Sequence, residues 1–147
     1  MIGDSKERPH QRLDVWRDAM DPVVLVYRFT AAFPADERYA LSSQMRRAAV
    51  SVPSNIAEGA ARRSTAELIR FLSIARGSLA ELDTQLLLAS RLELAKPDTE
   101  LGQLLDRTFA RLNALIRSKE QASSVREDAA LYESPITNHE SRPQSHA

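Results

Sequence analysis

Apolar residues recur at helical spacing in four segments of the chain, and no segment alternates apolar and polar positions as a strand does. In the clearest segment they follow a spacing of three and four over three heptads: Leu68, Leu72, Ala75, Leu79, Leu82, Leu86 and Ala89. Ser64 and Glu67 stand before it as a capping box, and Pro97 disfavours helix at the residue before it. We predict a helix from about Thr65 to Ala95.

A second helix follows almost at once, because Asp98 or Thr99 is suited to cap it. Its expected buried stripe consists of Leu101, Leu105, Phe109, Leu112 and Ile116. A connection this short predicts that the two helices lie antiparallel.

The first half of the chain predicts two more helices, each interrupted by a proline. One runs from Asp14 to Phe33, with a kink or a restart at Pro22. Its expected seam is Leu13, Trp16, Met20, Val23 and Tyr27, with Trp16 and Tyr27 as core anchors. The other opens at Asp36 and bends at Pro53. Its expected buried face is Leu41, Met45, Ala48, Val52 and Ile56.

These four segments predict an all-α protein, an antiparallel up-down-up-down four-helix bundle over residues 13–119. Residues 1–12 are expected to be a flexible N-terminus. Residues 120–147 lack apolar periodicity and contain several Ser, Pro and acidic residues, so we expect a disordered acidic C-terminal tail.

The 20 basic and 20 acidic side chains balance over the whole chain, but they are unevenly distributed along it. Residues 38–76 hold seven arginines and two glutamates, a net charge of +5, whereas residues 120–147 hold two arginines and five acids, a net of −3. A basic middle of this kind is typical of an anion-binding surface, and the alternative is a solvated arginine-rich exterior.

The chain has no cysteine, no apolar leader segment and no apolar run long enough to cross a bilayer. From these features we expect a cytoplasmic protein that does not associate with a membrane.

Three strings, in order, resemble a known family: LDVW at residues 13–16, RRAAVSVPSNIAEG at 46–59 and FLSIARGSLAEL at 71–82. Over roughly residues 12–119 the chain is similar to the four-helix bundle proteins first noticed in intervening sequences of bacterial large-subunit ribosomal RNA genes. That family is similar to the accessory variability protein of diversity-generating retroelements. The resemblance implies a bacterial protein and a homopentameric ring of four-helix protomers. It also implies a possible nucleic-acid partner, since the basic retroelement branch binds nucleic acid and a reverse transcriptase.

Two segments are candidates for the oligomer interface. Residues 51–59 form either a kinked helix that presents Asn55 and Glu58 to an adjacent protomer, or a proline bend whose freed backbone groups bond nearby Ser and Asn side chains. Gly77 and Ser78 lie within a predicted helix, where glycine is costly unless another helix approaches closely. Glu81 either pairs with arginines across a subunit boundary or lies on a solvated face.

Five arginines are candidates for contact with nucleic-acid phosphates, because the planar guanidinium matches phosphate oxygens bidentately. They are Arg46, Arg47, Arg62, Arg63 and Arg70. Aromatic residues are sparse among them, which argues against stacking of single-stranded bases and leaves contact with the phosphate backbone.

No motif indicates catalysis, a cofactor or a metal. The three histidines (His10, His139 and His146) fall in the predicted terminal segments, and no Glu-x-x-His, glycine-rich phosphate loop or nucleophile elbow occurs. Our leading hypothesis is a non-catalytic homo-oligomeric scaffold that binds RNA or DNA, or a ribonucleoprotein, through the basic middle region. The alternative is a scaffold that binds another protein, and a remote third is an enzyme that uses helix carboxylates such as Glu58 or Glu81.

Overall fold

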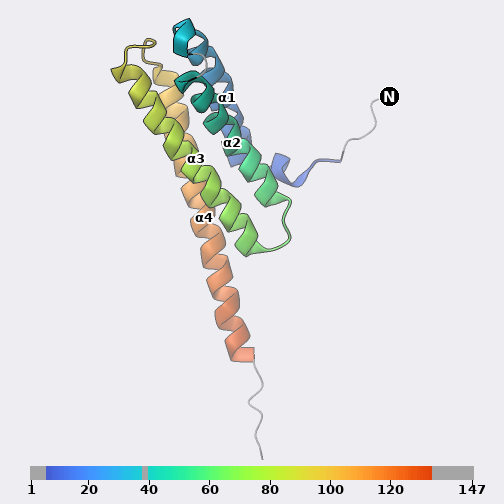
Figure 1. Cartoon of the computed structure of the whole chain (residues 1–147). Coiled ribbons are helices and arrows are strands. Elements are labelled where there is room, and N and C mark those ends of the chain that lie inside the picture. Colours follow the sequence, from blue (N-terminus) through green and yellow to red (C-terminus); the bar gives the residue numbers. More distant parts are fainter. Residues whose placement is uncertain (1–5, 38–39, 134–147) are drawn as a thin grey trace, which may run out of the picture.

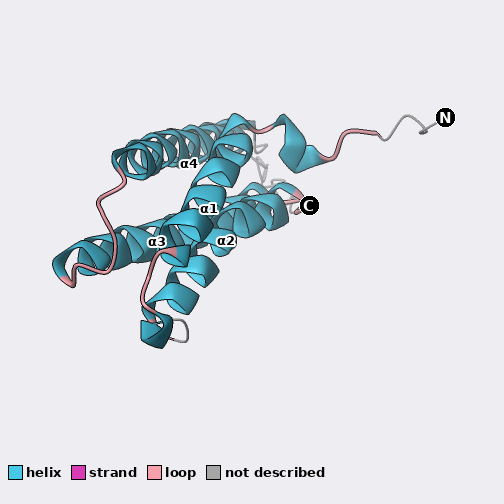
Figure 2. Ribbon diagram, turned by 90° about the horizontal axis from the view of Figure 1, so that it is seen from above, coloured by secondary structure: helices cyan, strands magenta, loops and turns pink. Residues whose placement is uncertain are grey.

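The computed structural model describes residues 6–37 and 40–133, and every regular element in these two ranges is a helix (Figures 1 and 2). Four long helices follow in order: α1 Asp14–Ala31, α2 Leu41–Ala60, α3 Thr65–Arg91 and α4 Thr99–Glu133. Two short 3-10 helices, η1 Pro9–Arg12 and η2 Ala35–Glu37, precede α1 and α2. Each long helix packs on the next in sequence, and α4 also packs on α1, so the four form a closed bundle. The expected all-α bundle of four helices is confirmed.

The core forms around α2 and α3, whose apolar faces agree with the sequence pattern. Met45 and Ile56 of α2 are fully buried, as are Leu72 and Leu82 of α3. The Ser64 half of the predicted capping box is confirmed, because its hydroxyl accepts a hydrogen bond of 3.1 Å from the backbone N–H of Glu67. No helix in the described ranges is long and apolar enough to cross a membrane.

The predicted seam of α1 was wrong at two of its five positions, because Met20 and Tyr27 are 43% and 45% exposed. The seam residues that are partly buried and packed against the core, as predicted, are Leu13, Trp16 and Val23. The buried positions that the prediction missed include Val15, Ala19 and Val26. The helix carries apolar residues on two adjacent stripes, and packing against α2 and α4 decides which one is buried.

The boundaries and the proline of α1 also differ in part from the prediction. The helix begins at Asp14, as predicted, but ends at Ala31, two residues before Phe33. Pro22 lies buried inside one continuous helix, so no restart occurs there.

The helix boundaries around α2 and α3 correct two further predictions. A 3-10 turn occupies residues 35–37, so α2 begins at Leu41 rather than Asp36. The end of α3 at Arg91 comes four residues before the expected Ala95, because Glu93 adopts a left-handed conformation with φ of 56°. The N–H of Leu94 then bonds the carbonyl of Ala89 at 3.0 Å, which closes the helix in a Schellman motif.

Both chain ends hold more structure than expected. Residues 9–12 form η1, which packs on α1 and α2 and sets the His10 ring 4.8 Å from that of Trp16. Residues 120–133 continue α4 beyond the other helices (Figure 1). This stretch contains no Pro or Gly to end a helix, so its lack of periodicity correctly indicated exposure but not disorder. Residues 1–5 and 134–147 lie outside the described ranges. The predictions of a flexible N-terminus and a disordered tail are therefore not tested for these residues.

Candidate nucleic-acid interface

Three of the five candidate arginines gather where α2 passes into α3. We call Arg62, Arg63 and Arg70 the basic corner. The guanidinium carbons of Arg62 and Arg70 lie 5.0 and 4.8 Å from the centre of the Phe71 ring. The ring itself is buried, so it acts as a fixed support that holds both cations at the surface by cation–π attraction.

The carboxylates near the basic corner neutralise only part of its charge. Arg62 donates to Glu58 at 3.0 Å, and its Nε lies 3.9 Å from Glu67. In residues 6–37 and 40–133, Arg63 and Arg70 have no ion pair. Both are exposed, so two guanidinium groups are available to phosphate oxygens at this corner.

Gly59 allows α2 and α3 to approach closely at the basic corner, whereas the sequence pattern predicted a close approach at Gly77. A Cβ atom on Gly59 would lie 2.8 Å from Cβ of Phe71 and 3.3 Å from the backbone oxygen of Leu68. Gly77, where we expected a close approach, has no such neighbour within 4 Å. Within the protomer Gly77 therefore faces open space, and only another molecule would bring a helix against it.

Arg46 and Arg47 lie far from the basic corner. Arg46 and Arg62 are separated by 16 positions, which corresponds to about 24 Å along a helix at 1.5 Å per residue. The Arg46 guanidinium lies 4.5 Å from the Tyr27 ring centre, and its Nε donates to the Thr30 hydroxyl at 2.8 Å. Arg47 is exposed. The five arginines thus form two separate groups rather than one cluster.

Two of the candidate interface residues make contacts inside the protomer. The hydroxyls of Ser51 and Ser78 lie 2.8 Å apart and link α2 to α3. The Asn55 amide donates to the Ser51 carbonyl at 2.8 Å, and the Ser54 hydroxyl donates to that of Val50 at the same distance. These bonds are made to the carbonyls of Val50 and Ser51, whereas the carbonyl that loses its helical donor to Pro53 is that of Ala49.

The remaining candidates are exposed carboxylates. Glu58 pairs with Arg62, and Glu81 accepts a hydrogen bond of 3.2 Å from the Gln85 amide. The described part of the chain holds no group of three or more His, Cys, Asp or Glu residues placed to bind a metal ion. His10 contacts Trp16, and His139 and His146 lie outside the described ranges.

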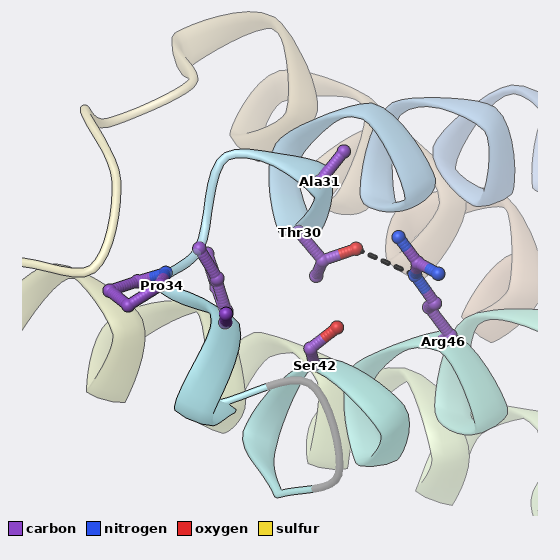
Figure 3. Close-up of a pocket in the computed structure, with 7 residues that line it drawn as sticks. Thr30, Ala31, Pro34, Ser42 and Arg46 are labelled. Carbon is purple, nitrogen blue, oxygen red and sulfur yellow. Dashed lines mark hydrogen bonds between the residues drawn. The ribbon is translucent and has the colours of Figure 1, made fainter.

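The spacing of two serines and two arginines on α2 is a sequence signal for a further polar site. Ser42 and Ser43 stand four positions before Arg46 and Arg47, so each serine shares a helix face with one arginine. In the structure Ser42, Arg46 and Thr30 line one cavity, with a volume of about 360 Å³, between the end of α1 and the start of α2 (Figure 3). Thr30 belongs to another helix, so no local pattern placed it there.

Comparison with models of known protein families gives a match. The model of the family described as 23S rRNA-intervening sequence protein matches residues 11–116, which include α1, α2, α3 and the packed part of α4. No curated protein matches the chain significantly.

Proposed function

The chain belongs to the 23S rRNA-intervening sequence protein family, and from this premise we propose that it is a non-catalytic scaffold that binds RNA or DNA through the basic corner. The observation that carries the proposal is a pair of exposed arginines beside the Phe71 support, Arg63 and Arg70, which form no ion pair with the residues that the structure describes. Contacts of this kind recognise the phosphate backbone, so binding is expected to be independent of sequence. The family's name, which refers to ribosomal RNA, is compatible with such a role.

We further propose that the protomer is antiparallel and assembles with itself, as a homopentameric ring in the cytoplasm. An exposed apolar stripe supports self-association: Met20, Val24 and Tyr27 follow a spacing of four and three on α1, and each is at least 43% exposed. On α3, Ile74, Gly77 and Glu81 share a second exposed face. The open space at Gly77 leaves room there for a helix of another protomer.

A ring would strengthen nucleic-acid binding without any new contact. Each basic corner offers few phosphate contacts, and single contacts of this kind are weak. In a ring the corners recur on every protomer, so their contacts add through multivalency.

A salt titration with a charge-reversal variant tests this function. We expect the protein to bind DNA or RNA at low salt and to lose affinity steeply as salt rises. Replacing Arg62 and Arg63 together by Glu should abolish binding and leave the helix content unchanged, because both side chains are exposed. The matched control replaces Arg117 and Arg126 of α4 by Glu, which changes the formal charge equally.

The control should keep most of the affinity. Binding that survives the Arg62 and Arg63 replacement, or no binding to single- or double-stranded nucleic acid at low salt, would contradict the proposal.

One observation favours a protein partner as the second candidate. The end of α4 carries exposed apolar side chains, since Val125, Leu131 and Tyr132 are 67%, 76% and 93% exposed. Residues 120–133 also carry one basic and four acidic side chains, a net charge of −3, which disfavours nucleic acid. If nucleic acid does not bind, this helix end is the surface on which to seek a protein partner.

A further inference from the structure

The cavity between the end of α1 and the start of α2 has the features of an anion site. Its walls are formed by Thr30, Ala31, Phe33, Pro34, Ala35, Ser42 and Arg46. Its volume of about 360 Å³ falls within the usual range of small-ligand pockets, roughly 300–1,000 Å³. Figure 3 shows the Ser42 hydroxyl pointing into the space beside Thr30 and Arg46.

Arg46 brings a positive charge to the cavity. It is partly buried, and none of the carboxylates whose side chains the structure describes, in residues 6–36 and 40–133, forms an ion pair with it. Its Nε donates to the Thr30 hydroxyl at 2.8 Å and its Nη2 to the Tyr27 carbonyl at 3.3 Å. A guanidinium has five N–H donors, so three remain after these two bonds. The Tyr27 and Thr30 contacts hold the guanidinium in place while its free donors stay accessible.

Ser42 places a hydroxyl at the wall of the cavity. The residue is 4% exposed, and it takes part in no hydrogen bond with the residues that the structure describes. Its oxygen is not one of the described side-chain atoms that are fully buried without a partner, so it is open to the cavity and can bond a ligand there. Because Ser42 and Arg46 are four positions apart on α2, their side chains lie on the same face and can reach one bound group.

The start of α2 adds to the positive field at this point. Helix geometry leaves the first backbone N–H groups of α2 without intrahelical partners. No side chain that the structure describes caps them, and no acidic residue occupies the first turn. The positive end of the helix dipole is therefore not compensated by a side chain of the first turn, and an anion would be stabilised there.

We infer that this cavity binds a tetrahedral oxyanion of the phosphate class, held by the Ser42 hydroxyl and the Arg46 guanidinium. The inference does not rest on the proposed nucleic-acid function, because a free phosphate or a small phosphoester fills the site as well as a backbone phosphate does. A second depression shares Ser42 and Arg46 and is lined also by Tyr27, Arg47 and Val50. It offers space for the organic part of a phosphoester.

The test is a titration of the full chain with sodium phosphate, replacing chloride at constant ionic strength and followed by amide NMR shifts. We expect saturable shifts at Ser42, Ser43 and Arg46. Ser42→Ala should weaken binding about 10-fold, as expected for a lost hydrogen bond to a charged group. Arg46→Gln should weaken it more, by about 100-fold, since it removes the charge and the bidentate donors.

The neighbouring residues supply matched controls. Arg47→Gln removes an equal charge next to the site, and Ser43→Ala removes the neighbouring hydroxyl; each should change affinity less than about 2-fold, as expected for exposed or partly exposed groups. Arg46→Gln also removes the hydrogen bond from Arg46 to Thr30, so its effect combines two losses. Ser42→Ala leaves that bond in place and therefore tests the site alone. Shifts that do not saturate would overturn the inference, as would equal affinities in the Ser42→Ala and Ser43→Ala variants.

Two further probes identify the source of the phosphate. Glycerol 2-phosphate represents small phosphomonoesters, and an unphosphorylated trinucleotide offers only phosphodiesters. Shifts of the same amides by the trinucleotide would assign the site to a nucleic-acid backbone, and shifts only with phosphate and the monoester would assign it to a small ligand. Both results support the oxyanion site. The Arg62 and Arg63 replacement at the basic corner should leave phosphate binding here unchanged, which separates a failure of this inference from a failure of the proposed function.

Discussion

At the scale of single residues, the two helical glycines of α2 and α3 have opposite surroundings. Gly59 lies under Phe71, where the space for a Cβ atom is already filled by side chain and backbone. Gly77 lies in the exposed middle of α3, where a Cβ atom would meet nothing within the protomer. The same residue type therefore permits close packing at one position and lowers helix stability at the other.

We expect Gly59→Ala to lower the free energy of unfolding by about 1–3 kcal/mol, the usual cost of overpacking. Gly77→Ala should raise it by about 0.5–1 kcal/mol in a monomer, because alanine favours helix. Chemical denaturation of both variants measures the difference. If Gly77→Ala instead destabilises the protein and weakens self-association, a neighbouring protomer contacts α3 at this position.

Glu93 provides a second prediction at this scale. It occupies the left-handed position after α3, where a side chain is strained and glycine is usual. Glu93→Gly should raise the free energy of unfolding by about 1 kcal/mol, measured by urea denaturation. A loss of stability would show that the Glu93 side chain makes a contact that outweighs the strain.

Leu79 tests the interior seam of α3. It is 1% exposed and lies at the middle of the seam. Leu79→Ala should cost about 2–5 kcal/mol, the range for emptying a buried leucine site. Leu87, which is 55% exposed on the same helix, is the matched control, and Leu87→Ala should change stability by less than about 0.5 kcal/mol.

At the scale of elements, α4 consists of a packed part and an exposed end. Its core contacts end at Ile116, and beyond that residue only Lys119 and Ser123 are even partly buried in the described range. The final turns are helical because nothing in their sequence breaks a helix, not because they pack.

We therefore expect deletion of residues 121–147 to leave the melting temperature nearly unchanged, since the deleted part buries little apolar surface. Far-UV circular dichroism should show less helix per molecule. A drop of many degrees on calorimetry would mean that this helix end docks against another protomer.

At the scale of the whole molecule, exposed apolar side chains and an exposed basic corner occur on one small bundle. The stripe on α1 and the open face of α3 are expected to bring protomers together. Sedimentation at micromolar concentration should show a species several times the 16.4 kDa chain mass, and about 82 kDa for five copies. A monomer throughout that range would contradict the ring and the multivalent binding that depends on it.

The sequence by itself determined the number of helices, the Ser64 cap and the buried faces of α2 and α3. These features depend on the order of residues along one helix, and a helix turns through the same angle wherever it lies. It also indicated the basic character of the residues around Arg62, because charge is a property of composition.

The tertiary structure decided which stripe of α1 is buried, which glycine lies in a close contact, and that five arginines form two groups. It also placed Thr30 beside Ser42 and Arg46, and Phe71 beneath two arginines. Each of these features depends on how one helix is rotated and shifted against another. That arrangement is set by contacts between residues distant in sequence, so no local pattern records it.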